Sequence, residues 1–376
     1  MGLAQRAALR AEADVARLTA YAGIETPTGD RAALDGFADL LATDAAALGA
    51  SARRVSLPDG DALVLELPGH GAPGGRAPAV LLGHHDTVHP VGSLAGPVPL
   101  DRDGDVLHGP GVYDMKGGLV VALSAFALLD GLDHRPVRLL LTPDEEVGSP
   151  TASAAVIAAA TGAAYALGLE PPHPDGALKT SRLGSTRWQL AVTGHASHAA
   201  LDPAAGINAI DELVDQLLMV RKLVAWYPDV LVNVGVVEGG GRTNVVPDAA
   251  RAVVGLRFVD RATERNVLDQ LATLVPKRRG AQVIGSVLTS RPAWGPSVTT
   301  DALLAKVTAA GRTVGQRVDG RAATGAADTN LTGSAGTVSL DGFGPLGGGA
   351  HTATEHVRLS SLTARAALLA AVLSTV

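Results

Sequence analysis

The chain of 376 residues contains no cysteine. That absence excludes disulfide frameworks, thiolate zinc sites and cysteine nucleophiles, so a transition-metal site would have to use His, Asp and Glu. Aromatic residues make up only 3% of the chain, so the core must pack mainly Ala, Val and Leu side chains. The 31 basic residues against 37 acidic ones give a net charge of −6, which lacks the basic excess typical of nucleic-acid-binding proteins.

Long hydrophobic runs are also absent. The longest apolar stretches, Gly117–Leu129 and Ala366–Leu373, are shorter than the roughly 20 residues of a membrane span. Charged residues occur throughout residues 1–23, so this segment lacks the apolar region of a secretory signal. Arg6 stands where a myristoylation motif has Ser or Thr. We therefore expect a cytoplasmic protein with no membrane or nucleic-acid partner.

The first half of the chain alternates between strand and helix patterns. Short continuous apolar runs at 79–83, 137–142 and 164–169 predict strands buried on both faces. The run at 117–129 predicts a buried helix between them, which is typical of an α/β layer with a largely parallel sheet. Apolar periodicity also predicts helices at 8–18, 34–48 and 362–374 and strands at 55–57 and 63–67.

From about Ser181 the pattern changes. Alternating segments at 186–192, 231–237, 252–258 and 282–290, with helical segments at 206–224 and near 264–274, give the order β-α-β-β-α-β. This order is typical of a ferredoxin-like module of about 110 residues. We therefore expect a discontinuous α/β domain formed by residues 1–180 and 293–376, into which an α+β domain of residues 181–292 is inserted.

Residue types that bind metals follow each of the three buried strands. They are His84, His85 and Asp86 after the first, Asp144, Glu145 and Glu146 after the second, and Glu170 after the third. In open α/β sheets the ligand crevice lies at the carboxyl ends of the strands, so these side chains should converge. The sequence therefore predicts a metal site at this edge of the sheet.

Two of these clusters suggest individual roles. In an extended chain His84 and Asp86 share a face while His85 points away, which suits a histidine ligand oriented by a carboxylate; His85 as the ligand is the alternative. Glu145 and Glu146 repel each other unless a positive charge neutralises them. A metal bound by one and a proton held by the other would give both a role, and a solvated acidic turn is the alternative.

Asp114 and His351 both lie in glycine-rich loops. Asp114 precedes the predicted buried helix, where it could equally be a simple N-cap. The loop lacks the spacing of a phosphate-binding P-loop. His351 follows three glycines, which permit close approach of the backbone to a ligand, although a surface histidine fits this position equally well.

Seven motifs occur in one order along the chain: GHHDTV (83–88), GPGVYDMKGG (109–118), TPDEEVGS (142–149), Glu170-Pro171, GHASHAALDPAAGINAI (194–210), GGGRTNVVPD (239–248) and GGGAH (347–351). Together they resemble the co-catalytic zinc family of aminoacylases, acetylornithine and succinyl-diaminopimelate deacylases, and bacterial glutamate carboxypeptidases of the carboxypeptidase G type. The resemblance is closest to the glutamate carboxypeptidases and spans nearly the whole chain. One stretch, Asp328-Thr329-Asn330, matches the family's Gly-Thr/Ser-Asp pattern only loosely.

The resemblance implies two zinc ions, with cobalt or manganese as alternatives. It makes His84 and Glu170 ligands of one ion and Glu146 and His351 ligands of the other. Asp114 would bridge both ions and precede a cis peptide bond to Met115. Asp86 would orient His84, and Glu145 matches the general base. A Glu at position 170 is more similar to the deacylases and carboxypeptidases than to the family's tripeptidases.

The inserted module resembles the family's dimerisation or lid domain, which implies a homodimer and a zinc-exopeptidase-like fold for the remainder. His198 matches a histidine that relatives supply to the active site of the partner subunit. Asn244 and Arg257 match lid residues that approach the substrate, although a turn cap and a strand salt bridge are the alternatives. Arg291 lies in a segment similar to one whose arginine binds the substrate carboxylate, a role that suits the guanidinium fork.

We therefore expect a di-zinc enzyme that cleaves an amide bond adjacent to a free carboxylate in a small molecule or peptide, as glutamate carboxypeptidases and N-acyl-amino-acid hydrolases do. An acetylornithine- or succinyl-diaminopimelate-type deacylase is the alternative among enzymes, because all share the zinc core. A catalytically silent metal-binding protein is the alternative of a different class, and Glu145 argues against it. The chain lacks the G-x-S-x-G motif of a serine hydrolase.

Overall fold

The computed structural model describes residues 1–376, which divide into two compact units. The first unit comprises Met1–Ser181, Pro296–Ala323 and Ala327–Val376, and the second comprises Arg182–Gly295 with Thr324–Ala326. Each unit has its own cluster of buried apolar side chains. The chain therefore leaves the first unit, builds the second, and returns to complete the first.

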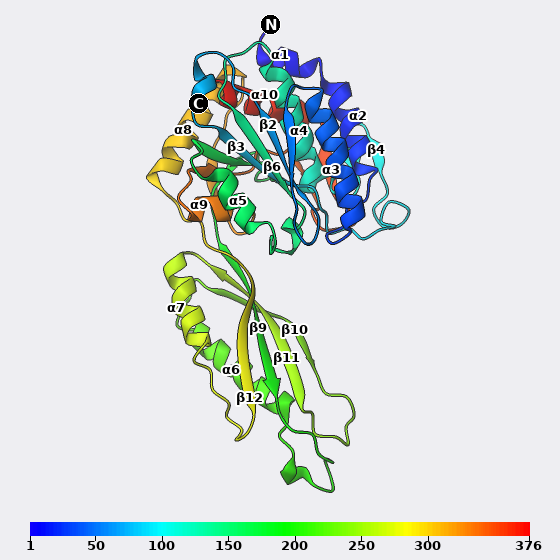
Figure 1. Ribbon diagram of the computed structural model, residues 1–376, viewed down its shortest axis with the longest axis vertical. Helices are drawn as coiled ribbons and strands as arrows, with labels where there is room; N and C mark the ends of the chain where they lie inside the picture. Colours follow the sequence, from blue (N-terminus) through cyan, green and yellow to red (C-terminus); the bar gives the residue numbers. More distant parts are fainter. The chain divides into compact units, whose positions relative to one another are not determined.

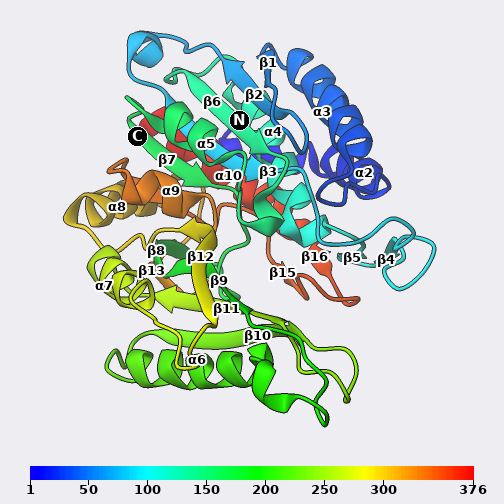
Figure 2. The ribbon, with the colours of Figure 1, turned by 60° about the horizontal axis from the view of Figure 1, so that its bottom comes forward.

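A six-stranded mixed sheet forms the centre of the first unit (Figure 2). Its strand order is β1 (Ser51–Val55), β2 (Ala62–Leu67), β6 (Val137–Thr142), β3 (Ala79–His84), β7 (Tyr165–Gly168) and β14 (Ser339–Leu340). Strands β6, β3, β7 and β14 run parallel, whereas β2 is antiparallel to both of its neighbours, β1 and β6. The carboxyl ends of β6, β3 and β7 consequently meet at one edge, as the expected α/β class requires.

Helices cover both faces of this sheet (Figure 1). Leu81 of β3 packs into the cluster that includes α4 (Gly117–Leu129) and α10 (Leu359–Thr375). Its neighbours Val80 and Leu82 pack into the cluster on the opposite face, with α5 (Ser153–Ala160) and α9 (Thr329–Ser334). Alternate residues of a strand point to opposite faces, so a continuously apolar strand needs a layer of helices on each side.

Helix α4 carries almost no polar side chain and is buried nearly all round. The segment Val112–Lys116 precedes it directly, and the backbone leaves the helical conformation at Asp114 and Met115. The combined segment Val112–Leu129 is long and apolar enough to cross a membrane by length and composition, and so exceeds the length expected from the sequence. However, 83% of it is buried inside the protein, as in the core helix of a folded domain.

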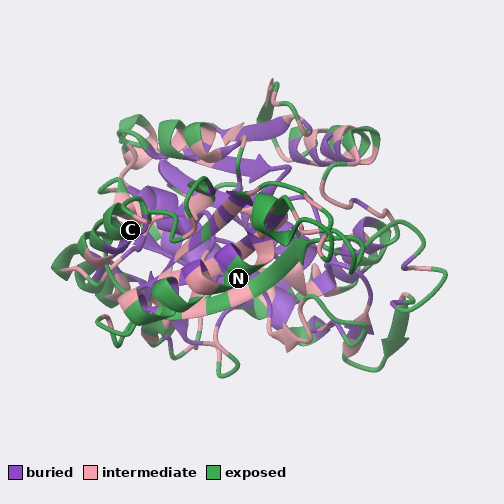
Figure 3. Ribbon diagram, turned by 90° about the horizontal axis from the view of Figure 1, so that it is seen from below, coloured by how far each residue is buried: buried purple, intermediate pink, exposed green.

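The remaining elements of the first unit lie around this core. Helices α1 (Leu3–Ala8), α2 (Ala11–Ala22), α3 (Arg31–Ala46) and α8 (Val298–Thr313) pack at its surface, so that buried residues concentrate on strands and on inner helix faces (Figure 3). A small four-stranded sheet has the order β15 (Gly347–Gly348), β16 (His356–Arg358), β5 (Val106–His108) and β4 (Asp101–Asp103). A two-stranded sheet pairs β13 (Gly320–Ala323) with β8 (Leu178–Arg182).

The second unit is an antiparallel sheet with two helices. Its strand order is β10 (Leu231–Gly239), β11 (Ala249–Phe258), β9 (Gly184–Thr193) and β12 (Gln282–Arg291). Helices α6 (Ala209–Val224) and α7 (Arg261–Leu271) bury apolar faces against alternate residues of these strands. The chain order β9-α6-β10-β11-α7-β12 is the predicted β-α-β-β-α-β pattern, so the expected fold class is confirmed for both units.

Several predicted boundaries were wrong. The helix expected at 8–18 corresponds to α2, which begins at Ala11 and extends to Ala22, and the separate helix α1 ends at Ala8. The strand expected at 55–57 is β1, at Ser51–Val55; most of its residues are exposed, so no apolar alternation marks it. Helix α6 begins at Ala209 rather than 206, because the Asn208 side chain accepts hydrogen bonds from the backbone N–H groups of Ile210 and Asp211 and caps the helix there.

Candidate metal centre

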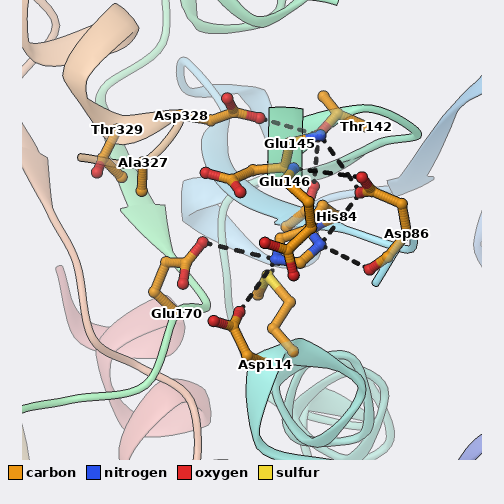
Figure 4. Close-up of polar contacts among 12 residues, drawn as sticks. His84, Asp86, Asp114, Thr142, Glu145, Glu146, Glu170, Ala327, Asp328 and Thr329 are labelled. Atoms are coloured by element: carbon orange, nitrogen blue, oxygen red, sulfur yellow. Dashed lines mark hydrogen bonds and ion pairs between the residues drawn. The ribbon is translucent and has the colours of Figure 1, made fainter. Parts of the chain in front are cut away.

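The strand β3 ends at His84, whose ring is held between carboxylates (Figure 4). The Nδ1 atom of His84 lies 3.2 Å from Oδ1 of Asp86 and 3.0 Å from the Asp86 carbonyl oxygen. Its Nε2 atom faces the other way, 3.2 Å from Oδ1 of Asp114 and 3.8 Å from Oε1 of Glu170. Fixing one ring nitrogen against a carboxylate leaves the other nitrogen aimed at a ligand position.

Asp86 also organises the loop that follows β6. Its carboxylate accepts hydrogen bonds from the backbone N–H groups of Glu145 (3.3 Å) and Glu146 (3.2 Å) and from the hydroxyl of Thr28 (2.7 Å). The same side chain therefore positions the His84 ring and the two adjacent glutamates. Burial raises the pKa of Asp86, but the hydrogen bond and charge of His84, together with the hydrogen bond of Thr28, outweigh burial and keep that pKa below its ordinary value.

Five of the predicted ligands form two groups of three that share one residue. His84, Asp114 and Glu170 form the first group, and Asp114, Glu146 and His351 form the second; within each, the ligand atoms lie within 4.8 Å of one another. The Nε2 atom of His351 lies 3.3 Å from Oδ2 of Asp114 and 3.1 Å from Oε2 of Glu146. Asp114 thus presents one carboxylate oxygen to each group, which is the geometry of a bridging ligand.

The donor chemistry of these groups fits divalent ions. All donors are imidazole nitrogens and carboxylate oxygens, a set that suits zinc, cobalt and manganese. Oε1 of Glu146 is buried without a hydrogen-bond partner, and a buried carboxylate oxygen in that situation is costly unless a cation neutralises it. Burial accordingly raises the pKa of Glu146 above its ordinary value.

The two histidines carry the positive charge that balances these carboxylates in the metal-free protein. Hydrogen bonds to Asp114 and Glu146 raise the pKa of His351 to about 11. Burial lowers the pKa of His84, but hydrogen bonds to Asp114 and Asp86 outweigh it and raise that pKa well above 6.5. Asp114 keeps a pKa below its ordinary value despite burial, because His351 and His84 donate to it.

His85, the alternative ligand, lies outside both groups. It is fully buried, and neither ring nitrogen has a hydrogen-bond partner. Burial lowers its pKa to about 4, so the ring is neutral. The alternation along the strand end therefore turns His84, and not His85, toward the carboxylates.

Glu145 lies next to the first ligand group. It is buried, and a small pocket is lined by Glu145 together with His84, Glu170 and Asp328. The chain turns sharply after the two glutamates, where Gly148 adopts a φ of 102°. This turn lets adjacent carboxylates project from one loop without extending the strand into the site.

The structure adds a residue whose role the sequence did not suggest. Asp328 is buried at the start of α9 and accepts hydrogen bonds from the hydroxyls of Thr142 (2.9 Å) and Ser149. These two residues bracket the loop that carries Glu145 and Glu146, so Asp328 ties its two ends together. The only signal for Asp328 in the sequence is that Asp328-Thr329-Asn330 loosely matches the family's Gly-Thr/Ser-Asp pattern. That match does not indicate which residues Asp328 binds.

The glycine-rich loop of Asp114 leads directly into α4. The Asp114–Met115 peptide bond is cis, as the resemblance implied. Asp114 is not the N-cap of α4, which is Lys116. The alternative of a simple capping role for Asp114 is therefore wrong, and its carboxylate is left to face the two histidines.

The other predicted residues belong to the second unit. The backbone N–H of Ala199 donates to the carbonyl oxygen of Asn244 (3.0 Å), so the loops of His198 and Asn244 lie side by side. His198 is exposed, and its Nδ1 accepts from the N–H groups of Ala200 and Leu201. The ring proton of the neutral form therefore lies on Nε2, which points away from this loop as a potential donor.

Arg257 and Arg291 form a pair on one face of the second sheet. Both are directly opposite Ser185 of the central strand β9, one on each side. Residues opposite one another share a face, and burial together with the charge of Arg291 lowers the pKa of Arg257. Both guanidinium groups therefore contribute positive charge to the same face of this sheet.

Comparison with known proteins identifies the family of the chain. Residues 80–375 match the model of peptidase family M20/M25/M40. The chain therefore belongs to the peptidase family M20/M25/M40, whose members are metal-dependent hydrolases. It is an enzyme, as expected, and a hydrolase of carboxypeptidase or deacylase type; a catalytically silent metal-binding protein is not supported.

Individual relatives span both types. The chain is 28% identical over 356 residues to carboxypeptidase G2 of Pseudomonas sp., covering 91% of this chain and 84% of that protein. It is 29% identical over 255 residues to succinyl-diaminopimelate desuccinylase of Novosphingobium aromaticivorans, covering 62% of this chain and 66% of that one. The structure of an M20 family metallo-carboxypeptidase from Sulfolobus solfataricus superposes with a TM-score of 0.74 at 15% identity, over 96% and 98% of the two chains, and shows the shared fold.

Metal loading should release protons from the two histidines. The pKa of His351 in the folded protein is about 11, above its ordinary value of 6.5, so the metal-free protein keeps this proton at neutral pH. The protonated ring stabilises the folded state, and this contribution is lost only as the pH rises toward 11. Zinc binds only the neutral imidazole, so zinc affinity should rise as the pH increases from about 6.5 to about 11.

Calorimetric zinc titrations at about pH 8, in buffers of different ionisation enthalpy, measure this release. We expect a net release of protons, and a smaller one in His351→Asn than in the control His195→Asn, which alters an exposed histidine of the second unit. Equal proton release in the two variants, or none in the unaltered protein, would contradict the proposed ligand role of His351.

Proposed function

We propose that the protein is a di-zinc hydrolase that cleaves an amide bond adjacent to a free carboxylate. The observation that carries this proposal is the division of the Asp114 carboxylate between two ligand groups, with Glu145 beside the first. A bridging carboxylate supports two ions held close together, and an adjacent base supports hydrolysis. Cobalt or manganese could replace zinc in the same donor set.

The chemistry follows from the placement of the side chains. Zinc ions held by His84, Asp114 and Glu170 and by Asp114, Glu146 and His351 would polarise the amide carbonyl and lower the pKa of a water molecule. Glu145 takes the proton from the attacking water and delivers it to the leaving nitrogen. Asp86 keeps His84 and the backbone of Glu145 in one orientation throughout, because it is hydrogen-bonded to both.

The positive pair in the second unit supports recognition of a carboxylate. Arg257 and Arg291 flank Ser185 on one face of the sheet, and a guanidinium fork binds a carboxylate through two parallel hydrogen bonds. We propose that Arg291, assisted by Arg257, binds the free carboxylate of the substrate, and that glutamate is the favoured leaving amino acid. His198 and Asn244 would stabilise the developing oxyanion and the bound substrate.

Deacylases among the relatives support a second candidate. The similarity to succinyl-diaminopimelate desuccinylase covers 62% of the chain, and acetylornithine deacetylase of Myxococcus xanthus is also related. A deacylase of either type would use the same metal groups and the same base. Only the groups that bind the acyl and amino parts of the substrate would differ.

We also propose a homodimer formed through the second unit. Strand β10 is at an edge of its sheet and exposes Leu231, Val236 and Val237. An exposed apolar edge strand favours pairing with another chain. Helix α6 likewise exposes Val214 and Leu218. The cytoplasmic location expected from the sequence stays a prediction.

A panel of amides tests the reaction and the substrate class together. The zinc-loaded protein is assayed with N-acyl-glutamates, N-acyl-aspartates, N-acetylornithine, succinyl-diaminopimelate and neutral N-acyl amino acids. We expect preferential release of glutamate. Turnover of N-acetylornithine or the diaminopimelate amide alone would favour the deacylase, and no turnover of any amide by zinc-loaded protein would contradict the proposal.

In the same assay, Glu145→Gln should lower kcat by about 10²- to 10⁴-fold, because it removes the proton acceptor. Zinc content should not change, since Glu145 is in neither ligand group. Glu12→Gln is the matched control, as Glu12 is exposed on α2. Full activity in Glu145→Gln would assign the base to another residue.

Arg291 has a test of its own. Arg291→Ala should raise KM for an N-acyl-glutamate and lower kcat/KM by roughly 10- to 100-fold, the loss expected for a charge-assisted hydrogen bond of about 1.5–3 kcal/mol. Arg291→Lys should recover part of the loss, because the charge stays and the fork is lost.

The control substrate is the same amide with its free carboxylate converted to a carboxamide. Its turnover should be insensitive to Arg291→Ala. The control variant is Arg251→Ala, on the same sheet, where Arg251 pairs with Glu238. If Arg291→Ala lowered kcat/KM equally for the N-acyl-glutamate and for its carboxamide, Arg291 would not bind the carboxylate.

A further inference from the structure

Glu355 is a buried carboxylate that the proposed mechanism does not use. It lies in the loop between β15 and β16, four residues after His351, and is 1% exposed. It belongs to neither ligand group. A buried acidic side chain is retained only where several donors satisfy it, so its partners indicate what it does.

Four donors converge on this one carboxylate. Oε1 accepts hydrogen bonds from the backbone N–H groups of Tyr113 and Asp114, each at 3.0 Å. Oε2 accepts from the backbone N–H of Gly111 at 2.9 Å and lies 2.6 Å from Nε2 of His89. The backbone carbonyl oxygen of Glu355 also accepts from the N–H of Gly109 (3.3 Å).

These contacts join three segments that carry proposed metal ligands. All three backbone donors to the carboxylate lie in the loop of Asp114, and one of them is the Asp114 N–H itself. His89 follows the strand end of His84 by five residues, and Glu355 follows His351 by four. The proposed ligands His84 and His351 reach Asp114 only through its carboxylate, whereas Glu355 holds the backbone of the Asp114 loop.

The contacts are not distributed equally between the two metal groups. The group of Asp114, Glu146 and His351 takes two of its three ligands from the loops that Glu355 joins. In the group of His84, Asp114 and Glu170, only Asp114 depends on a loop alone, because the central sheet also fixes His84, the last residue of β3, and Glu170, two residues after β7. Disturbing Glu355 should therefore affect the second group more than the first.

We propose that Glu355 is the positioning residue that sets Asp114 and His351 relative to each other, so that binding of the second ion depends on it. This inference rests on the proposed two-ion function. Residues behind metal ligands commonly change metal affinity by roughly 10- to 100-fold when altered. Glu355→Gln replaces one acceptor oxygen by an amide NH₂ group, which would face N–H donors in place of an acceptor.

The experiment measures the two zinc dissociation constants in competition with a chelator, together with the melting temperature of the metal-free protein. In Glu355→Gln we expect the dissociation constant of one zinc ion, the one held by Asp114, Glu146 and His351, to rise roughly 10- to 100-fold and the other constant to change much less. Glu12→Gln, the same chemical change on the exposed side of α2, should leave both constants unaltered. If Glu355 had only a structural role, Glu355→Gln would lower the melting temperature of the metal-free protein and leave the ratio of the two zinc dissociation constants unchanged.

Glu355→Asp provides the second variant should the Gln variant not fold. It retains the charge and both acceptor oxygens on a side chain one methylene shorter. The zinc dissociation constant that rises in Glu355→Gln should therefore also rise in Glu355→Asp, but by less. Two ions bound with unaltered affinities in a folded Glu355 variant would overturn this inference alone. A single ion bound by the unaltered protein would overturn the two-ion function and this inference with it.

Discussion

The structure depends on how four negative side chains are held together at one edge of a sheet. Asp114, Glu145, Glu146 and Glu170 are brought close to one another and to His84, an arrangement that like-charge repulsion and burial both oppose. In the metal-free protein the protons of His84 and His351 compensate for it, which is why the pKa values of both rings are raised. Two divalent ions would compensate more fully in the same positions, so the site is built for cations.

The surrounding fold supplies what this convergence requires. Parallel strands β6, β3 and β7 bring three strand ends to one edge. Helices on both faces of the sheet exclude water from these strands. The loops are then fixed by carboxylates that bind backbone N–H groups: Asp86 holds the Glu145 loop, and Glu355 holds the Asp114 loop. Each carboxylate accepts several hydrogen bonds, and such bonds to charged acceptors are the strong ones.

Much of this could be predicted from the sequence, because the signals are local. The apolar runs at 79–83 and 137–142 match β3 and β6, and the alternation at strand ends chose His84 over His85. The roles of Asp328 and Glu355 could not be predicted, because their partners lie 179 to 266 residues away along the chain. The short strands β4, β5, β15 and β16 likewise have two or three residues each, too few to show a period.

The central claim is that Asp114 bridges two metal ions, and anomalous X-ray diffraction at the zinc absorption edge tests it most directly. Crystals of the zinc-loaded protein should show two anomalous peaks about 3.5–4 Å apart, one beside His84 and Glu170 and the other beside Glu146 and His351, with the Asp114 carboxylate between them. A single peak, or two peaks too far apart for Asp114 to bind both ions, would contradict the claim.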